Sequence, residues 1–135
     1  SLCQKSIDIN IDNDIYMSGD EKQIRQMFNI LLDNAVKYSE PDSKIVVSLY
    51  KKGSKIIFKT FNQVKDIDKG NNDKIFERFY RRDTSRNSET GGFGIGLSVA
   101  KLIVTAHKGK IQAVSKDGRS LSIIVTFSAV QSNSN

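Results

Sequence analysis

Hydrophobic and polar positions along the chain follow two periods, one typical of strands and one typical of helices. The segment 6–11 (SIDINI) alternates with period two, which predicts a half-buried strand, and a short partner strand is expected near 15–17. Two further pairs of segments alternate in the same way, and each pair is joined by a glycine-containing turn typical of a hairpin. These predicted strands are 44–50, 55–61, 110–115 and 120–127.

Apolar residues recur at helical spacing in two segments. The first begins at Asp20, a good N-cap with Gln23 as its partner in a capping box, and it ends at SEPD (39–42), because proline cannot continue a helix. Its predicted apolar face consists of Ile24, Met27, Phe28, Leu31, Leu32 and Ala35. The second helix is predicted over 93–106, with Gly109 placed to terminate it. Its apolar residues are Ile95, Leu97, Val99, Leu102, Ile103 and Ala106.

The order of these elements indicates the fold class. Strands, helix, hairpin, loop, helix and hairpin predict an α+β sandwich, with helices on one face of a mixed, mainly antiparallel sheet. Residues 62–74 carry little apolar content and are interpreted as a loop or lid, whereas 75–80 (IFERFY) should be partly buried. The chain has 135 residues and is expected to form one domain, with a core over about 5–128 and a frayed tail at 129–135.

Composition and charge exclude several classes of protein and favour an anionic partner. Apolar residues make up 38% and charged residues 27%, which excludes collagen-like, mucin-like and wholly disordered chains. No apolar run approaches the roughly 20 residues of a membrane span, and the first residues lack the layout of a signal peptide. The single cysteine, Cys3, favours a reducing compartment. The formal net charge of +6 suits an anionic partner, and four arginines between 78 and 86 favour nucleotide phosphates over nucleic acid.

The glycine-rich run 91–98 (GGFGIGLS) is a candidate phosphate site. It is not a P-loop, because Leu97 stands where the lysine belongs, and it does not follow a strand as a Rossmann fingerprint does. A glycine segment that leads into a helix N-terminus nevertheless offers free amides and the positive end of the helix dipole to phosphate. An ordinary loop before a helix explains such a run about as often.

A second candidate lies on the first helix. Asn34, Lys37 and Tyr38 are spaced at i, i+3 and i+4, so they share a face, which is expected to lie opposite the main apolar stripe. An amide oxygen can ligate Mg²⁺, an ammonium can meet phosphate, and a tyrosine ring can stack on a base. Taken without context, a helix edge with a solvated lysine and a half-buried tyrosine is the more frequent explanation.

The order and spacing of three segments decide between these explanations. They are 30–39 (ILLDNAVKYS), 75–83 (IFERFYRRD) and 91–104 (GGFGIGLSVAKLIV). Together they resemble the N box, F box and second glycine box of the catalytic ATP-binding domain of bacterial sensor histidine kinases. That domain has the Bergerat fold of the gyrase, chaperone, histidine kinase and MutL superfamily. The resemblance covers about residues 5–128 and implies a single Bergerat-type domain.

The resemblance implies a set of contacts to ATP and Mg²⁺. Asn34 would ligate the metal, Lys37 would touch phosphate, and Tyr38 would pack beside the adenine. Arginines of a lid around 63–92, which would order on nucleotide binding, would reach the phosphates, and glycines would shape its hinge. The implied nucleotide-binding residues are Asn34, Lys37, Tyr38, Asn62, Arg81, Arg86, Gly92, Gly94, Gly96 and Leu97.

Two motifs depart from the family pattern. Many members have a second asparagine one turn before the metal-binding one, where this chain has Ile30, and Asn29 lies one residue off that face. The first glycine box is usually DxGxG, and here Asn62, Val64 and Asp66 take the places of its aspartate and two glycines. An asparagine oxygen can still accept a hydrogen bond from the adenine amine. Asn62 is therefore interpreted as an adenine anchor in a variant box, and ATP is expected to bind weakly.

His107 is the single histidine, and it is interpreted as structural. It stands in the last turn of the second helix, where an imidazole can cap carbonyls and interact with the negative end of the dipole. By resemblance, the phosphoacceptor histidine and its acidic base lie upstream, on a dimerisation hairpin, so no catalytic residue is expected in this chain. Asp33, next to the metal-binding position, is interpreted as a solvated helix residue.

The function that the resemblance implies is phosphoryl transfer. The domain would bind Mg-ATP and donate the γ-phosphoryl to a histidine on the dimerisation domain of a homodimeric, membrane-bound sensor kinase, which passes it to a response regulator. The isolated domain is expected to be a cytoplasmic monomer. The altered first glycine box motivates an alternative, a degenerate module that binds protein partners with weak or no nucleotide binding. The IFERFYR segment and short lid disfavour a protein-serine kinase or ATPase of the superfamily, and a nucleic-acid module, which would bind salt-sensitively, is least favoured.

Overall fold

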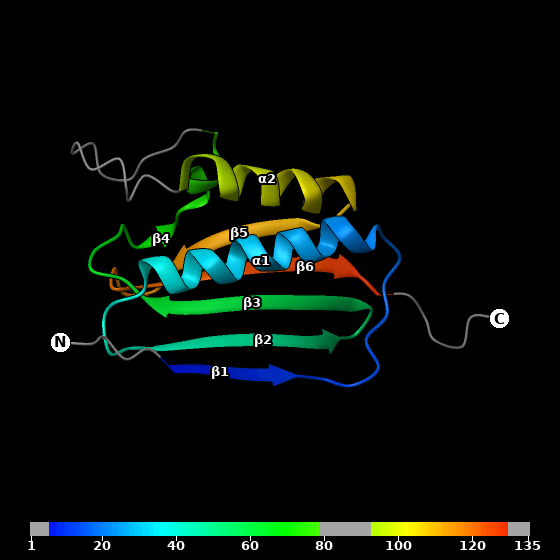
Figure 1. Ribbon diagram of the computed structural model, residues 1–135, viewed down its shortest axis with the longest axis horizontal. Coiled ribbons are helices and arrows are strands. Elements are labelled where there is room, and N and C mark those ends of the chain that lie inside the picture. Colours follow the sequence, from blue (N-terminus) through cyan, green and yellow to red (C-terminus); the bar gives the residue numbers. More distant parts are fainter. Residues whose placement is uncertain (1–5, 79–92, 130–135) are drawn as a thin grey trace.

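The computed structural model describes residues 6–78 and 93–129, which form a six-stranded sheet with helices on one face (Figure 1). The strands are β1 (Ser6–Ile11), β2 (Lys44–Lys52), β3 (Lys55–Gln63), β4 (Gly70–Asn71), β5 (Lys110–Ser115) and β6 (Ser120–Ser128). The helices are α1 (Glu21–Tyr38), α2 (Phe93–Ala106) and the short 3-10 helix η1 (Asp73–Phe76).

The strand order β1-β2-β3-β6-β5-β4 makes the sheet mixed and mainly antiparallel. Only β1 and β2 pair in parallel within the described sheet, and α1 forms the crossover between them. The remaining neighbours are antiparallel and include the two predicted hairpins, β2–β3 and β5–β6. The sequence-based prediction of an α+β sandwich is therefore confirmed.

The N-terminal strand differs from its prediction in two respects. Residues 15–17 form no strand, and β1 pairs with β2 instead, with Ile7 opposite Ile45. Every residue of β1 is exposed, so the predicted half-burial is wrong. The physical reason is that β1 is an edge strand, and α1 packs against β3 and α2 further into the sheet (Figure 1).

Helix α1 begins at the predicted N-cap. The side chain of Asp20 accepts a hydrogen bond from the Gln23 backbone at 3.1 Å. The reciprocal half of the predicted capping box does not form, because the Asp20 backbone N–H donates instead to Nε2 of His107 at 3.0 Å. Ser39 caps the C-terminus, as expected before Pro41. The predicted apolar face is confirmed, with Met27, Leu31 and Ala35 buried and Ile24, Phe28 and Leu32 packed against the core.

The buried face of α2 is rotated relative to its prediction. Leu97 and Ile103 are buried as expected, but Leu102 is 69% exposed, whereas Ala100 and Val104 are fully buried. Ala106, another of the apolar residues at helical spacing, is also exposed. Residues 97, 100 and 104 are spaced by three and four, so they face one side of the helix. Leu102 lies outside that stripe. Because α2 carries apolar residues on more than one face, their positions alone do not show which face is buried.

The segment predicted as a loop or lid is partly fixed to the sheet. Strand β3 extends to Gln63, and the Val64 N–H donates to the Arg119 carbonyl at 2.9 Å. Asn72 is buried, and its side-chain amide donates to the carbonyls of Asp68 and Gly70 at 2.8 and 3.1 Å. A carboxylate oxygen of the next residue accepts from the Ala113 N–H at 2.8 Å. The part of the predicted lid that lies before residue 79 therefore forms regular contacts with the core.

The C-terminus of α2 is a Schellman-type turn. The Lys108 N–H donates to the Thr105 carbonyl and the Gly109 N–H to the Val104 carbonyl, both at 2.9 Å. The residue in the left-handed conformation is Lys108, with φ of 61°, so the predicted role of Gly109 is wrong by one position. Gly109 is instead required by close packing, because a Cβ there would lie 2.7 Å from Phe127 Cδ1 and from the Thr126 carbonyl oxygen.

Substitutions of Gly109 and Lys108 are expected to change the free energy of unfolding in opposite directions. Gly109→Ala should lower the free energy of unfolding by about 1–3 kcal/mol, because Phe127 and the backbone of β6 must shift. Lys108→Gly should raise it by up to about 1 kcal/mol, because glycine removes the steric cost of the left-handed backbone. Urea unfolding followed by circular dichroism measures both changes. Equal effects of the two substitutions would contradict this assignment.

Candidate functional site

A pocket of about 200 Å³ lies where the C-terminal half of α1 meets the beginning of α2. The two helices pack against each other, and these two ends lie on the same side of the molecule (Figure 1). Helix α1 contributes most of the lining and α2 contributes two residues. The lining residues are Ile30, Asp33, Asn34, Lys37, Tyr38, Gly96 and Leu97.

Asn34 is the most distinctive residue of this pocket. It is only 7% exposed, and its side-chain amide makes no hydrogen bond to any other residue that the structure describes. Because Asn34 lines the pocket and its amide atoms are not buried from solvent, the amide is available to water, an ion or a ligand there. The amide oxygen is a neutral, hard donor of the kind that Mg²⁺ accepts. The pocket therefore holds a polar group suited to a metal ion.

Lys37 and Tyr38 line the same pocket, one turn further along α1. The Lys37 side chain is exposed, and its Nζ lies 5.5 Å from the centroid of the Tyr38 ring. The predicted shared face of Asn34, Lys37 and Tyr38 is thus found. Its predicted position opposite the apolar stripe is wrong, because Asn34 is buried next to Ala35 and Tyr38 packs against the core. The face borders α2 across the pocket, while Lys37 stays exposed.

Helix α2 closes the other wall of the pocket. A Cβ on Gly96 would lie 3.6 Å from Cγ2 of Ile30, so the two helices meet at these residues. Ile30 thus forms an apolar wall at the position where many family members have a second asparagine, while Asn29 is exposed and does not line the pocket. Leu97 is buried and Gly94 lies in the first turn of α2. The predicted residues Gly94, Gly96 and Leu97 are therefore brought to one helix start.

Asn62 lies on the sheet below this region. It is 2% exposed near the end of β3, where the Glu40 N–H donates to the Gln63 carbonyl at 2.9 Å and so ties the strand to the end of α1. Its amide nitrogen makes a long hydrogen bond of 3.3 Å to the Gln63 carbonyl. Two residues earlier, the hydroxyl of Thr60 is buried without a hydrogen-bond partner in the described structure. The end of β3 thus carries one buried hydroxyl without a partner and one amide with a long hydrogen bond.

Sequence reasoning did not predict several features of this region. Ile30 and Asp33 both line the pocket, and Asp33 is exposed, as expected of a solvated helix residue. Thr60 gave no signal, because threonine is common in strands and only the structure reveals its missing partner. Arg81, Arg86 and Gly92, which the resemblance assigned to the nucleotide, lie outside the described residues, as do Phe79 and Tyr80. Phe76 is buried in the core, which agrees with the structural role expected of it.

The charged groups near the pocket do not form a metal cluster of their own. Within residues 6–78 and 93–129, no group of three or more His, Cys, Asp or Glu side chains is close enough to hold an ion. Asn34 is the pocket residue that fits Mg²⁺ through its unpartnered amide. A cation held by one protein oxygen takes its other ligands from phosphate and water, as Mg²⁺ commonly does.

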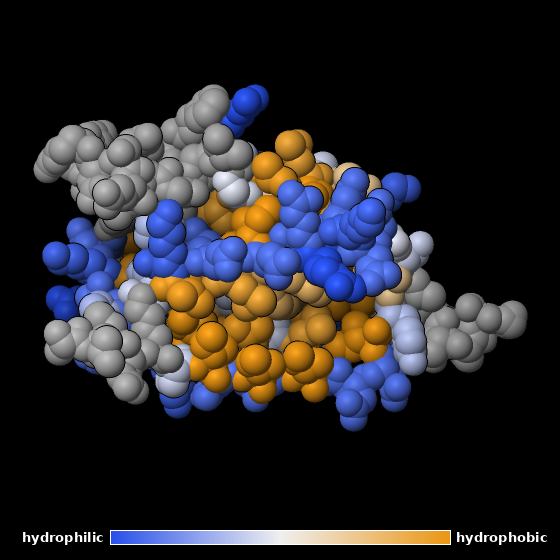
Figure 2. Space-filling model, viewed as in Figure 1, coloured by the Kyte–Doolittle hydropathy of each residue, from blue (hydrophilic) through white to orange (hydrophobic). Residues whose placement is uncertain are grey.

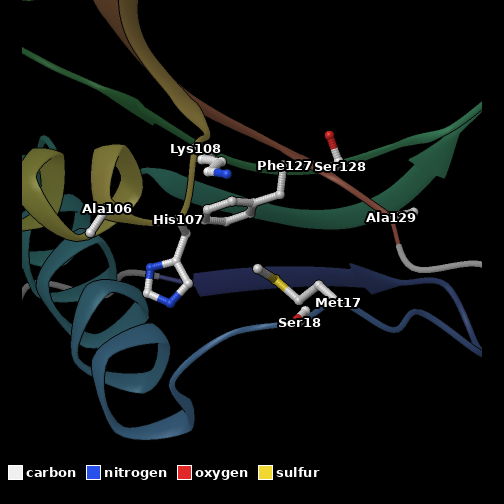
Figure 3. A pocket seen from close by; sticks show the side chains of 8 residues that line it. All are labelled: Met17, Ser18, Ala106, His107, Lys108, Phe127, Ser128 and Ala129. Carbon is white, nitrogen blue, oxygen red and sulfur yellow. The ribbon is translucent and has the colours of Figure 1, made fainter.

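A second pocket, of about 460 Å³, lies at the opposite end of α2 (Figure 3). Met17, His107 and Phe127 are among the side chains that line it, and the rings of His107 and Phe127 meet edge to face with centroids 6.3 Å apart. Both imidazole nitrogens are already used. Nδ1 lies 2.8 Å from the Ile103 carbonyl, to which it donates, because Nε2 accepts from the Asp20 N–H. His107 is therefore a structural link between the two helices.

A comparison with known protein families matches the part of the chain that forms the pocket. The family described as "Histidine kinase-, DNA gyrase B-, and HSP90-like ATPase" matches residues 19–131, which include both pocket helices. The chain belongs to this family. The sequence-based resemblance to the catalytic domains of histidine kinases is thus confirmed.

Individual relatives are sensor kinases of bacteria. The chain is 39% identical over 109 residues to the sensor protein VanS of Enterococcus faecium, covering 81% of this chain and 28% of VanS. It is 36% identical over 129 residues to the sensor histidine kinase YkoH of Bacillus subtilis, covering 95% of this chain and 28% of YkoH. The chain thus spans about a quarter of the length of these relatives.

Solved structures support the fold. The mycobacterial sensor histidine kinase MprB matches with a TM-score of 0.76 at 21% identity, covering 93% of this chain and 82% of that chain. The catalytic domain of the histidine kinase ThkA matches with a TM-score of 0.74 at 23% identity, covering 92% of this chain and 78% of that chain. At these identities the match establishes the architecture of the sheet and helices.

His107→Ala is expected to destabilise the fold without changing the pocket at the other end of α2. The substitution removes the hydrogen bonds to Asp20 and Ile103 and the contact with Phe127, which should lower the free energy of unfolding by about 1–3 kcal/mol. Urea unfolding measures this loss, and titration with an ATP analogue should give an unchanged dissociation constant. Lys101→Ala, on the exposed side of α2, is the control. A selective loss of nucleotide affinity in the histidine variant would contradict a purely structural role.

Proposed function

We propose that this chain is the ATP-binding catalytic domain of a sensor histidine kinase. It binds Mg-ATP in the pocket between α1 and α2 and donates the γ-phosphoryl to a histidine on the dimerisation domain of the same kinase. The observation that carries this proposal is that the amide of Asn34 lines a pocket that also contains Lys37, Tyr38 and the glycine-containing start of α2. A site of this composition complements a metal-bound polyanion attached to an aromatic base.

Different residues of the pocket would contact different parts of the nucleotide. The Asn34 oxygen would hold Mg²⁺, which when bound neutralises charge on the phosphates. The Lys37 ammonium is exposed at the pocket and is free to meet a phosphate without breaking a salt bridge in the described structure. The Tyr38 ring, half-buried beside it, offers an aromatic surface to the base. Free amides at the start of α2 add the positive end of a helix dipole.

The chemistry that follows is positioning and electrostatic stabilisation. A nitrogen of the acceptor imidazole would attack the γ-phosphorus while the bond to the β–γ bridging oxygen breaks and ADP leaves. The imidazole proton would pass to an acidic residue on the acceptor domain. The pocket in this chain would hold the triphosphate in line and compensate its charge, and it would supply no nucleophile.

The remainder of the proposed kinase lies outside this chain. A dimerisation domain would bring the acceptor histidine to the pocket, and a response regulator would receive the phosphoryl group. We place the domain in the cytoplasm, as part of a membrane-bound bacterial sensor. In the described segments, the structure contains no helix long and apolar enough to cross a membrane.

The altered first glycine box motivates the rival proposal of a degenerate, partner-binding module. Val64 is partly buried against the core where the family has a glycine, and Asn62 replaces a carboxylate. Against this rival, Asn34, Lys37 and Tyr38 line one pocket together with the first turn of α2, a composition that suits a metal-bound nucleotide. This shared pocket favours nucleotide binding.

Asn34→Ala is expected to abolish the dependence of nucleotide binding on Mg²⁺. Loss of the metal-facing amide should weaken binding of a non-hydrolysable ATP analogue by about 10- to 100-fold in the presence of Mg²⁺, with little change in its absence. Isothermal titration with and without the metal measures both effects. Asn29→Ala removes an exposed amide from the same helix and should bind as tightly as the wild type. No binding by the folded wild type at millimolar analogue would support the degenerate module instead.

Asn62→Ala is expected to weaken recognition of the base. Removal of one neutral hydrogen-bonding group should raise the dissociation constant for the ATP analogue by about 3- to 10-fold. The same substitution should have no effect on purine riboside triphosphate, which lacks the exocyclic amine. Titration of both nucleotides into both proteins, after thermal melts have shown that the variant folds, gives the comparison. Equal affinities of wild type and variant for the ATP analogue would remove the assignment of Asn62.

A further inference from the structure

The face of the sheet that points away from the helices is covered by no element of the described structure (Figure 1). Residues of β3 alternate between the two faces. Ile56 and Phe58 are buried beneath the helices, whereas Ile57 and Lys59, which point to the other side, remain partly exposed. The same alternation in β2, β5 and β6 directs every second residue to this side. We call this side of the sheet the open face.

Four lysines, which we call the lysine patch, gather at one end of the open face. They are Lys52, Lys55, Lys59 and Lys110. Lys52 lies directly opposite Lys55 in the antiparallel pair β2–β3, and Lys59 lies further along the same face of β3. Lys110 begins β5 opposite Thr126 of β6, which is itself opposite Ile57, between the two lysines of β3. Strands lie about 4.8 Å apart and alternate residues of a strand about 6.6 Å apart, so the patch measures roughly 15 Å in each direction.

The positive charge of the lysine patch is not compensated within the described structure. The salt bridges there involve other residues, and on the open face Asp8 pairs with Lys44 at 3.3 Å. Asp12, which follows β1, is also engaged, because its carboxylate accepts from a backbone N–H of β2 at 3.3 Å. Like charges directly opposite each other destabilise a strand pair, so Lys52 and Lys55 would gain from an anionic partner. The patch is therefore complementary in charge to a negative surface.

Apolar side chains stand between these lysines. Tyr50 of β2 lies opposite Ile57 of β3, and Ile124 of β6 lies opposite Lys59. All of them are only partly buried. The methylene stems of lysine can lie along such side chains while the ammonium groups stay in water. Lysines interspersed with an aromatic ring and aliphatic side chains are typical of surfaces that lie in a membrane interface.

The helix-bearing side of the sheet differs in chemical character. An apolar area runs along β1 and β2 there, below the polar outer surface of α1 (Figure 2). It includes the exposed side chains of Ile7, Ile9 and Ile11, which the pairing with β2 directs to that side. The candidate pocket also lies on that side, between α1 and α2. A partner on the open face therefore leaves the pocket accessible.

We infer that the open face binds the anionic lipid surface of the membrane in which the parent kinase is anchored. The location at a membrane comes from the proposed function, and the inference rests on it to that extent. The cytoplasmic leaflet carries a negative surface potential, and each lysine that approaches it strengthens binding roughly fivefold. Four lysines strengthen it by roughly several hundredfold, which is a weak interaction for a free domain. Attachment to a membrane anchor raises the local concentration, so a weak affinity suffices.

An acidic protein segment fits the open face less well. A helix is about 10 Å wide and covers roughly two strands, whereas the lysine patch extends over the neighbouring strands from β2 to β5. A bilayer surface is wider than the patch and can meet all of its ammonium groups at once. The sheet is twisted, but long, flexible lysine side chains can follow that curvature. The width of the patch therefore favours a lipid surface.

Co-sedimentation of this chain with lipid vesicles, in the absence of nucleotide, tests the inference. Vesicles of phosphatidylcholine with about 30% phosphatidylglycerol should bind the chain at least about tenfold more tightly than vesicles of phosphatidylcholine alone. Raising the NaCl concentration from about 0.1 to 0.5 M should release the bound chain, because salt screens the attraction. Equal binding to the two kinds of vesicle, or binding to neither, would overturn the inference.

A matched pair of double substitutions identifies the surface. Lys55→Glu with Lys59→Glu should weaken binding to the anionic vesicles by about 25-fold or more. Lys22→Glu with Lys101→Glu changes the net charge equally, at exposed positions of α1 and α2, and should weaken binding by no more than about threefold, because charges far from the membrane are screened. Equal losses in the two variants would show that only net charge matters and would contradict binding through the open face. Both variants should bind the ATP analogue as tightly as the wild type, which separates this test from that of the proposed function.

Tyr50→Trp distinguishes a lipid surface from an acidic protein. The chain contains no tryptophan, so the new indole is the single reporter, and it lies among the lysines. Its emission should shift to shorter wavelength on the anionic vesicles, because the ring enters the membrane interface. Bound vesicles that leave the emission unchanged would contradict contact through this face. Binding of soluble poly-glutamate but not of vesicles, lost in the variant with Lys55→Glu and Lys59→Glu, would assign the face to an acidic protein and likewise overturn the inference.

Discussion

The structure depends on the need to bury one face of a six-stranded sheet. The helix-bearing face presents Ile45, Ile56 and Phe58, together with Ile123 and Val125, and these side chains are removed from water only where α1 and α2 lie over them. Each helix therefore directs its most apolar stripe to the sheet and a flank to its neighbour. The candidate pocket forms along that shared flank, where packing is less apolar. The site is thus a consequence of how two helices share one sheet.

The two helices are held differently at their two ends. At the N-terminus of α1 and the C-terminus of α2, His107 joins them by accepting from Asp20 and donating to Ile103. At the other end, the pocket separates them and the small Gly96 faces Ile30. The interface between α1 and α2 is thus joined by hydrogen bonds at one end and contains a pocket at the other. This arrangement keeps the start of α2 beside Asn34 without filling the space between them. Residues at the start of α2 and Lys37 of α1 then line the same cavity.

Most of the architecture follows from local patterns, and the exceptions have identifiable physical causes. Period-two runs and glycine turns predicted both hairpins, and Asp20 predicted the start of α1, because these signals are contained within a few residues. The pairing of β1 with β2 and the burial of Ala100 in place of Leu102 depend on contacts distant in sequence, which local patterns do not encode. Spacing brought Asn34, Lys37 and Tyr38 together correctly, but whether their face meets solvent or α2 is a tertiary property. Thr60 is the clearest case, because a missing hydrogen-bond partner has no sequence signature.

The surfaces that this chain presents differ in chemical kind. The Asn34 side chain is 7% exposed and lines a pocket, so its amide can bind a polar or ionic group that enters the pocket. The isoleucines of β1 are apolar and exposed, so their free energy improves only when another apolar surface excludes water from them. A small charged ligand can therefore bind at the first surface and gains nothing at the second.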